Sequence, residues 1–272
     1  MNWIGLLTSV VGPTTFVTAL VFFIGYAYAD SFYHYFGLDA ATLGFTTSDV
    51  LLRGSPALYL PIGGLLFGML LVVLAYHLAT GRGVSRWVRP VCLVLAAAVL
   101  PLLVLGFLGG FRVVDFGRAG TPVLIGGSLL LAILARMLFV RGTGSPYPLT
   151  GERAAFGVIV AIVVLCSFWA ATEYAHAKAT EDARRLSTQL YLRPAMVVDT
   201  TEHLYLAWPA VHEDQLADAG HGQRFRYRYH GFRLLAQSGS RMFLIPRDWT
   251  WDTGNVVVLP LDSDVRVTFH PG

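Results

Sequence analysis

The chain has 272 residues, of which 55% are hydrophobic and only 14% are charged. Soluble domains carry about a quarter charged residues, so this composition excludes an ordinary soluble protein. The formal net charge of +3 rests almost wholly on arginine. Many of these arginines end apolar runs, as in membrane proteins, so the charge predicts no nucleic-acid partner.

The charges are distributed unevenly along the chain. Residues 1–172 hold 9 Arg, no Lys and 5 acidic residues, whereas residues 173–272 hold 11 basic and 12 acidic residues. The composition therefore changes near residue 173 from one suited to lipid to one suited to water. It predicts three parts: a transmembrane helix bundle (1–172), a helical stalk (173–193) and a soluble β domain (194–272).

Five apolar stretches reach the length of about 20 residues that a helix needs to cross a bilayer. They cover residues 10–29, 55–79, 90–111, 121–140 and 154–172. Lipid offers no partners for backbone polar groups, so each stretch is expected to be a helix. No Lys or Arg precedes the first stretch, which favours an uncleaved anchor over a signal peptide cut after Ala29.

Arginines near the helix ends predict the orientation. Five spans place the loops 82–89 and 141–153 on the side of the N-terminus, together with Arg82, Arg86, Arg89, Arg141 and Arg153, and Arg136 lies at the same face. The opposite side holds Arg53, Arg112 and Arg118. The positive-inside rule then predicts a multi-pass protein of the cell membrane with a cytoplasmic N-terminus and an extracytoplasmic C-terminal domain. Lys178, Arg184 and Arg185 follow the last span and would make the number of basic residues equal on the two sides.

The stalk is rich in alanine and is expected to end before Pro194, which cannot continue a helix. Its apolar stripe either pairs with a second stalk or rests on its own domain; it comprises Ala175, Ala179, Leu186 and Leu190. Beyond Pro194, alternating apolar residues and turn signals predict strands. The expected strands are 195–200, 203–207, 224–229, 232–236, 242–245, 256–259 and 265–269, with a loop or helical turns over 211–219. Short strands joined by tight turns predict a small, mostly antiparallel barrel or sandwich.

Two parts of the chain resemble bacterial multi-pass membrane proteins that carry a small C-terminal β domain. The first comprises Tyr33–Leu38 and Leu43–Leu51, and the second comprises Ser238–Pro246, Val256–Pro260 and Val265–Phe269. Those proteins have no named activity, so the resemblance implies the layout alone and assigns no functional residues.

Three sets of residues are candidates for interaction. The loop between the first two spans carries apolar side chains that either dock on the β domain or rest in the membrane interface: Tyr33, Tyr35, Phe36, Leu43 and Phe45. A basic strand face, Arg224, Arg226 and Arg228, suits an anionic protein or lipid headgroups. Gly64 and Gly68 form a GxxxG motif for packing within the bundle or between copies.

No set of residues has the spacing of a catalytic, cofactor or metal site. His203, His212, His221 and His230 recur every nine residues, which places them on no common helix or strand face. The aspartates at 248, 252, 262 and 264 border predicted turns, where their side chains bond the local backbone. Cys92 and Cys166 both lie inside apolar runs.

The sequence therefore predicts no enzyme and no cofactor. It favours a membrane-anchored interaction or sensor module whose β domain binds a partner. The alternative is an oligomeric pore or membrane-permeabilising effector that the β domain gates.

Overall fold

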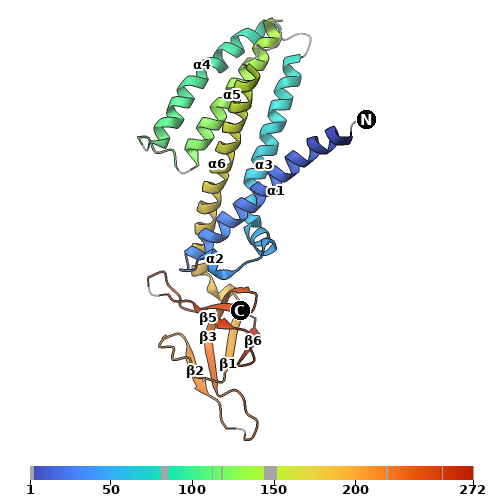
Figure 1. Cartoon of the computed structure of the whole chain (residues 1–272). Coiled ribbons are helices and arrows are strands. Elements are labelled where there is room, and N and C mark those ends of the chain that lie inside the picture. The colour runs from blue at the N-terminus through green and yellow to red at the C-terminus, as the bar shows by residue number, and fades with distance from the viewer. Residues whose placement is uncertain are drawn as a thin grey trace. The chain divides into compact units, whose positions relative to one another are not determined.

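The computed structural model contains long helices and a small antiparallel sheet, arranged as two compact units (Figure 1). It describes residues 3–80, 85–111, 113–117, 119–143, 152–218, 220–252 and 254–271. The first unit comprises Met1–Ile24 and Ser55–Ala175, and the second comprises Gly25–Gly54 and His176–Gly272. The helices are α1 (Trp3–His34), α2 (Ala40–Leu43), α3 (Thr47–Thr80), α4 (Ser85–Gly110), α5 (Gly120–Thr143) and α6 (Glu152–Thr188).

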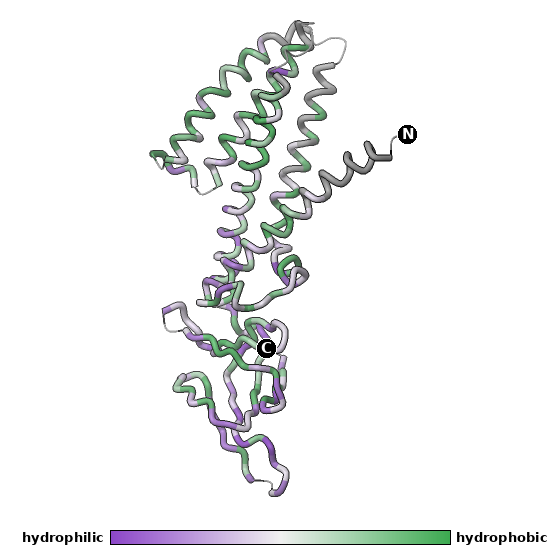
Figure 2. The backbone as a smooth tube through the Cα atoms, in the orientation of Figure 1, coloured by the Kyte–Doolittle hydropathy of each residue, from purple (hydrophilic) through white to green (hydrophobic). Residues whose placement is uncertain are grey.

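Each predicted span lies on a long helix, and four stretches of the described residues are apolar and long enough to cross a membrane. These are Thr47–Gly68, Pro90–Gly110, Gly120–Val140 and Ala154–Thr188. In the predicted first span, most side chains between residues 10 and 17 lie outside the described part of the chain. Arg82, Arg112 and Arg118, which were used to predict the orientation, also lie outside it. Large apolar side chains face outward, with Leu66, Phe107 and Leu165 65%, 53% and 67% exposed. Figure 2 shows how hydrophobic residues dominate α4 and α5.

Glycines bring the helices of the first unit into close contact. A Cβ at Gly106 of α4 would lie 2.7 Å from Cγ1 of Ile125 on α5, so only glycine fits there without a shift. Gly109 approaches Thr121 in the same way. By contrast, Gly64 and Gly68 are exposed, and no described atom lies within 4 Å of a Cβ built on either. Among the described residues, the close glycine contacts of this unit therefore include those of Gly106 and Gly109.

The second unit contains one sheet with the strand order β5-β4-β3-β1-β6, and β2 pairs with β3 outside this path. The strands are β1 (Ala195–Thr200), β2 (His212–Gln215), β3 (Tyr227–Ser238), β4 (Arg241–Pro246), β5 (Val257–Pro260) and β6 (Val265–His270). All pairings are antiparallel, and β5 and β6 end the described path. The predicted barrel or sandwich is thus wrong in detail: helix ends and a loop cover the sheet, so no second sheet is needed to bury it.

The twelve-residue strand β3 replaces two predicted strands. One edge of β3 pairs with β1, and the other pairs first with β2 and then, past Gly231, with β4. Gly231 has φ +100°, and a Cβ there would lie 2.0 Å from the carbonyl oxygen of Ala210. The predicted break in the chain is therefore a glycine irregularity inside one strand.

A loop covers one face of the sheet where residues 203–207 were predicted to form a strand. Leu204, Leu206 and Trp208 pack on a core that includes Tyr229 and Phe232. The buried Tyr229 hydroxyl accepts a hydrogen bond from the Leu204 amide at 2.8 Å. The alternating pattern of 203–207 thus reflects packing on the sheet. The predicted loop or helical turns over 211–219 instead include β2.

Helix ends pack in the second core of this unit. Ala183 and Leu190, from the end of α6 and the short 3₁₀ turn Leu190–Leu192, are buried with Ala29 and Tyr33 of α1. The helix ends at Thr188, before Pro194 as predicted. Two residues of its predicted stripe, Leu186 and Leu190, pack in this core and so contact their own chain. Tyr28 donates a hydrogen bond to Asp182 at 2.9 Å, and Asp182 also pairs with Lys178.

Helices α1 and α3 cross in the second unit at a pair of glycines. A Cβ on Gly54 would lie 2.3 Å from the Cα of Gly25, and a Cβ on Gly25 would lie 3.0 Å from the Val50 carbonyl oxygen. The two backbones therefore touch without intervening side chains. This crossing fixes the hairpin that carries α2.

We expect Gly54→Ala to lower stability by about 1–3 kcal/mol, because the new methyl group forces the two backbones apart. The matched control is Gly64→Ala on the same helix, where a Cβ meets open space among the described residues. That change should be neutral or stabilise by up to about 1 kcal/mol, since alanine favours a helix over glycine. Thermal unfolding in detergent measures both, and equal midpoints for the two variants would contradict the crossing.

Candidate interaction site

The hairpin formed by residues 25–54 docks on the chain's own sheet. Tyr33, Phe36 and Leu43 are buried in one core with residues of β3 and β4, and Tyr35 and Phe45 pack at its margin. The rings of Tyr35 and Phe36 lie 5.9 and 4.9 Å from Trp249. Of the two alternatives for these aromatic residues, the structure therefore shows docking on the β domain.

Arg53 fastens this hairpin to the sheet. Its guanidinium lies 4.6 Å from the centroid of the Phe45 ring and donates hydrogen bonds to the Tyr33 hydroxyl and, at 3.3 Å, to the Gln237 carbonyl oxygen. Burial raises the pKa of Tyr33 although the Arg53 charge opposes the shift, so the phenol stays protonated. Sequence reasoning used Arg53 only as an orientation charge. Its position among aromatic residues is the signal for a cation–π contact.

Side chains of opposite charge alternate across four strands at the other end of the sheet. Arg266 of β6 lies opposite Asp199 of β1, Asp199 opposite Arg228 of β3, and Arg228 opposite Asp214 of β2. We call this row the charge ladder. Arg228 binds Asp199 through two hydrogen bonds of 2.7 and 3.1 Å, and Arg266 Nε donates to the same carboxylate at 3.0 Å.

Asp199 is the buried centre of the charge ladder. Its side chain is 3% exposed, and the hydrogen bonds from Arg228, followed by those from Arg266, hold its pKa below the ordinary value. A carboxylate at this depth is stable only because both arginines supply donors. The sequence analysis did not identify Asp199. A single acidic residue within a predicted apolar strand is the pattern that could have indicated a buried ion pair there.

The three arginines of the predicted basic face have different surroundings. Arg228 belongs to the charge ladder, and Arg224 pairs with Asp264 at 3.2 Å on the surface. Arg226 is exposed, and its side chain has no ion pair within the described residues. Arg226 is thus the member of the predicted face whose charge is open to an external anion.

The polar strand β2 lies beside this arginine cluster. All four of its residues are exposed, and it pairs with β3 alone in the described part of the chain. His203 contacts Glu213 at 2.8 Å, and His230 lies 3.4 Å from Asp214. His212 lies opposite His230 across β2 and β3, and the described residues hold no group of three or more potential metal ligands. The arrangement offers hydrogen bonds and charge for recognition.

We expect Asp199→Asn to destabilise the sheet by about 1.5–3 kcal/mol, because two arginines lose a charged acceptor. The effect depends on pH. Since folding lowers the pKa of Asp199, its stabilisation is fully present above about pH 4 and is lost as the pH falls toward the folded-state value. The variant should lose this acid dependence.

The matched control is Asp264→Asn, because Asp264 and Arg224 are 61% and 54% exposed. Exposed ion pairs contribute about 0–1 kcal/mol, so this variant should unfold close to the wild type. Denaturant titration from pH 3 to pH 7, followed by tryptophan fluorescence, tests both variants. Parallel curves for the wild type and Asp199→Asn would show that the ladder does not hold the sheet.

No protein-family model, curated protein or solved structure matches the chain.

Proposed function

We propose that the protein is a membrane-anchored interaction module that crosses the cell membrane five times and presents its sheet outside the cytoplasm. Its five long helices each contain one of the predicted spans, and large apolar side chains face outward from the first unit. These observations support burial in lipid, where exposed leucine and phenylalanine side chains cost nothing. The arginine distribution supports the orientation.

The interaction role is supported by a difference between the two ends of the sheet: one end is covered by helices, and the other is exposed. Near Gln237 and Trp249 the sheet is covered by the 25–54 hairpin and the end of α6. Near Arg226 it is polar and exposed. One end therefore serves attachment, and the other end is available for recognition.

The partner that suits the exposed end is an acidic protein segment. Arg226 supplies a positive charge that is exposed to solvent, and the exposed Arg224 lies two residues before it in the segment that leads into β3. The outer edge of β2 adds backbone donors and acceptors that an extended segment can pair with. Charge at such a rim sets the rate and specificity of association.

Membrane insertion and sidedness can be measured with cysteine labelling. Cys92 and Cys166 are both buried and are first replaced by alanine. Ala217→Cys, at an exposed position after β2, should react with a membrane-impermeant maleimide on intact cells, whereas Ser145→Cys in the predicted cytoplasmic loop should react only after lysis. The protein should also resist extraction by alkaline carbonate. Release by carbonate would contradict membrane insertion, and the reverse labelling pattern would contradict the orientation.

Partner binding is best tested with point variants of the full chain. Removing residues 195–272 would uncover Tyr33 and Phe36 and so confound the result. We expect Arg226→Glu to lower recovery of the cross-linked partner about tenfold, since reversed charge repels an acidic segment.

The matched control is Arg247→Glu, at an exposed arginine beyond β4. This variant should recover the partner as well as the wild type. Equal losses for both variants would remove the specific role of Arg226. Cross-links only between copies of the chain would instead favour the alternative of an oligomeric pore, for which the open α3 face at Gly64 and Gly68 is available.

A further inference from the structure

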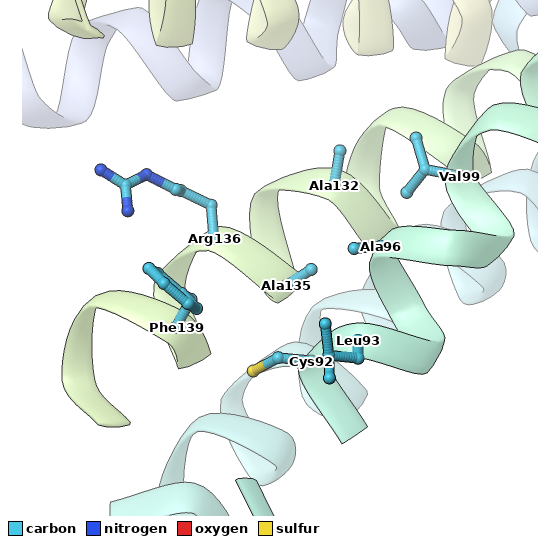
Figure 3. Close-up of a pocket in the computed structure, with 8 residues that line it drawn as sticks. All are labelled: Cys92, Leu93, Ala96, Val99, Ala132, Ala135, Arg136 and Phe139. Carbon is cyan, nitrogen blue, oxygen red and sulfur yellow. The ribbon is translucent and has the colours of Figure 1, made fainter. Parts of the chain in front are cut away.

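A cavity of about 620 Å³ lies between α4 and α5 within the first unit. Its lining is almost wholly apolar and includes one guanidinium (Figure 3); the residues are Cys92, Leu93, Ala96, Val99, Ala132, Ala135, Arg136 and Phe139. Its volume falls in the range of about 300–1,000 Å³ that small-molecule sites occupy. The three alanines create this hollow, because larger side chains on two facing helices would fill it.

The cavity has a polar end and an apolar end. Cys92 lies two residues after the start of the apolar stretch of α4, and Arg136 lies four residues before the end of that of α5. The two positions therefore belong to the same end of the hairpin. Ala132 lies one helical turn deeper, about 6 Å along the axis at 1.5 Å per residue. A ligand with an anionic head and an apolar tail matches this order.

We infer that the cavity binds one acyl chain of an anionic phospholipid and that Arg136 binds the phosphate group. The inference rests on the membrane placement proposed above, although it is independent of the partner that the sheet binds. A long arginine side chain about one turn from the end of the apolar stretch reaches the headgroup level, and its guanidinium can bond two phosphate oxygens at once.

The location of the cavity favours an anionic lipid over a zwitterionic one. In the proposed orientation its polar end lies at the cytoplasmic leaflet, which carries the anionic lipids. The cavity also opens to the outside of the helix pair, since Leu93 and Phe139 are 71% and 50% exposed. A lipid can therefore enter sideways from the bilayer without any movement of the chain.

Native mass spectrometry of the full-length protein, released from vesicles of equal parts phosphatidylglycerol and phosphatidylcholine, tests the assignment. The wild type should retain one phosphatidylglycerol about fivefold more often than phosphatidylcholine, as expected for one arginine near a phosphate. Arg136→Gln should abolish this preference while some lipid of either kind remains. Ala96→Leu should lower the retention of both lipids, because the larger side chain narrows the cavity.

Ala97→Leu is the matched control, since Ala97 is the exposed neighbour of Ala96 and does not line the cavity. It should retain lipid as the wild type does, and the elution profile of each variant checks its folding. Unchanged lipid preference in Arg136→Gln, or equal retention in Ala96→Leu and Ala97→Leu, would overturn the inference. So would a wild-type dimer that Ala96→Leu converts to a monomer, because a second copy would then occupy the cavity. Carbonate extraction separates a failure here from a failure of membrane insertion.

Discussion

The sheet of the second unit depends on helix ends to bury one of its faces. Leu235, Phe243 and Ile245 point into a core that α1, the hairpin and α6 close with Tyr33, Leu43 and Ala183. An isolated small sheet would leave this apolar face in water, at a cost of about 25 cal/mol for each Å² exposed. The unit is therefore built from two distant parts of the chain, and neither part buries its apolar residues alone.

Small residues and polar pairs make this assembly specific. Gly25 and Gly54 let α1 and α3 cross at backbone contact, and Ala179 and Ala183 are fully buried on α6. Hydrogen bonds then fix the arrangement: Ser31 pairs with His176, and the Ser238 hydroxyl donates to the Gly44 carbonyl oxygen at 3.2 Å. Apolar contact supplies most of the stabilisation, whereas these hydrogen-bonded pairs favour one way of packing the helix ends on the sheet over other apolar packings.

Local signals predicted most of the secondary structure. Charge-free runs mark the long helices, Pro194 marks the end of α6, and short apolar segments bounded by turn residues mark β1, β4, β5 and β6. The errors arise where a non-local contact decides. Gly231 resembles a strand break until its contact with Ala210 is known, and residues 203–207 alternate because they pack on the sheet and do not pair with it.

The candidate site was harder to predict for the same reason. Arg224, Arg226 and Arg228 alternate along the sequence as one basic face, and their spacing gives no hint of Asp199 on β1 or Arg266 on β6. Those partners are set by strand order, which the sequence does not specify. The aromatic residues Tyr33 and Phe36 were likewise recognisable as a docking surface, but their target required the topology.

The charge ladder and the apolar core together limit how the sheet can respond to a partner. The ladder ties β6, β1 and β3 through one buried carboxylate, and β2 adds Asp214 opposite Arg228 in the strand register. At the far end of β3, the Gln237 carbonyl accepts from Arg53, which in turn holds the α1–α3 hairpin. Strand β3 thus connects the exposed polar end to the helix ends by direct contacts alone. Arg53 shares this role with the Ser238 hydroxyl, which donates to the Gly44 carbonyl oxygen, and with the buried Leu235, so the helix ends meet β3 over a continuous surface.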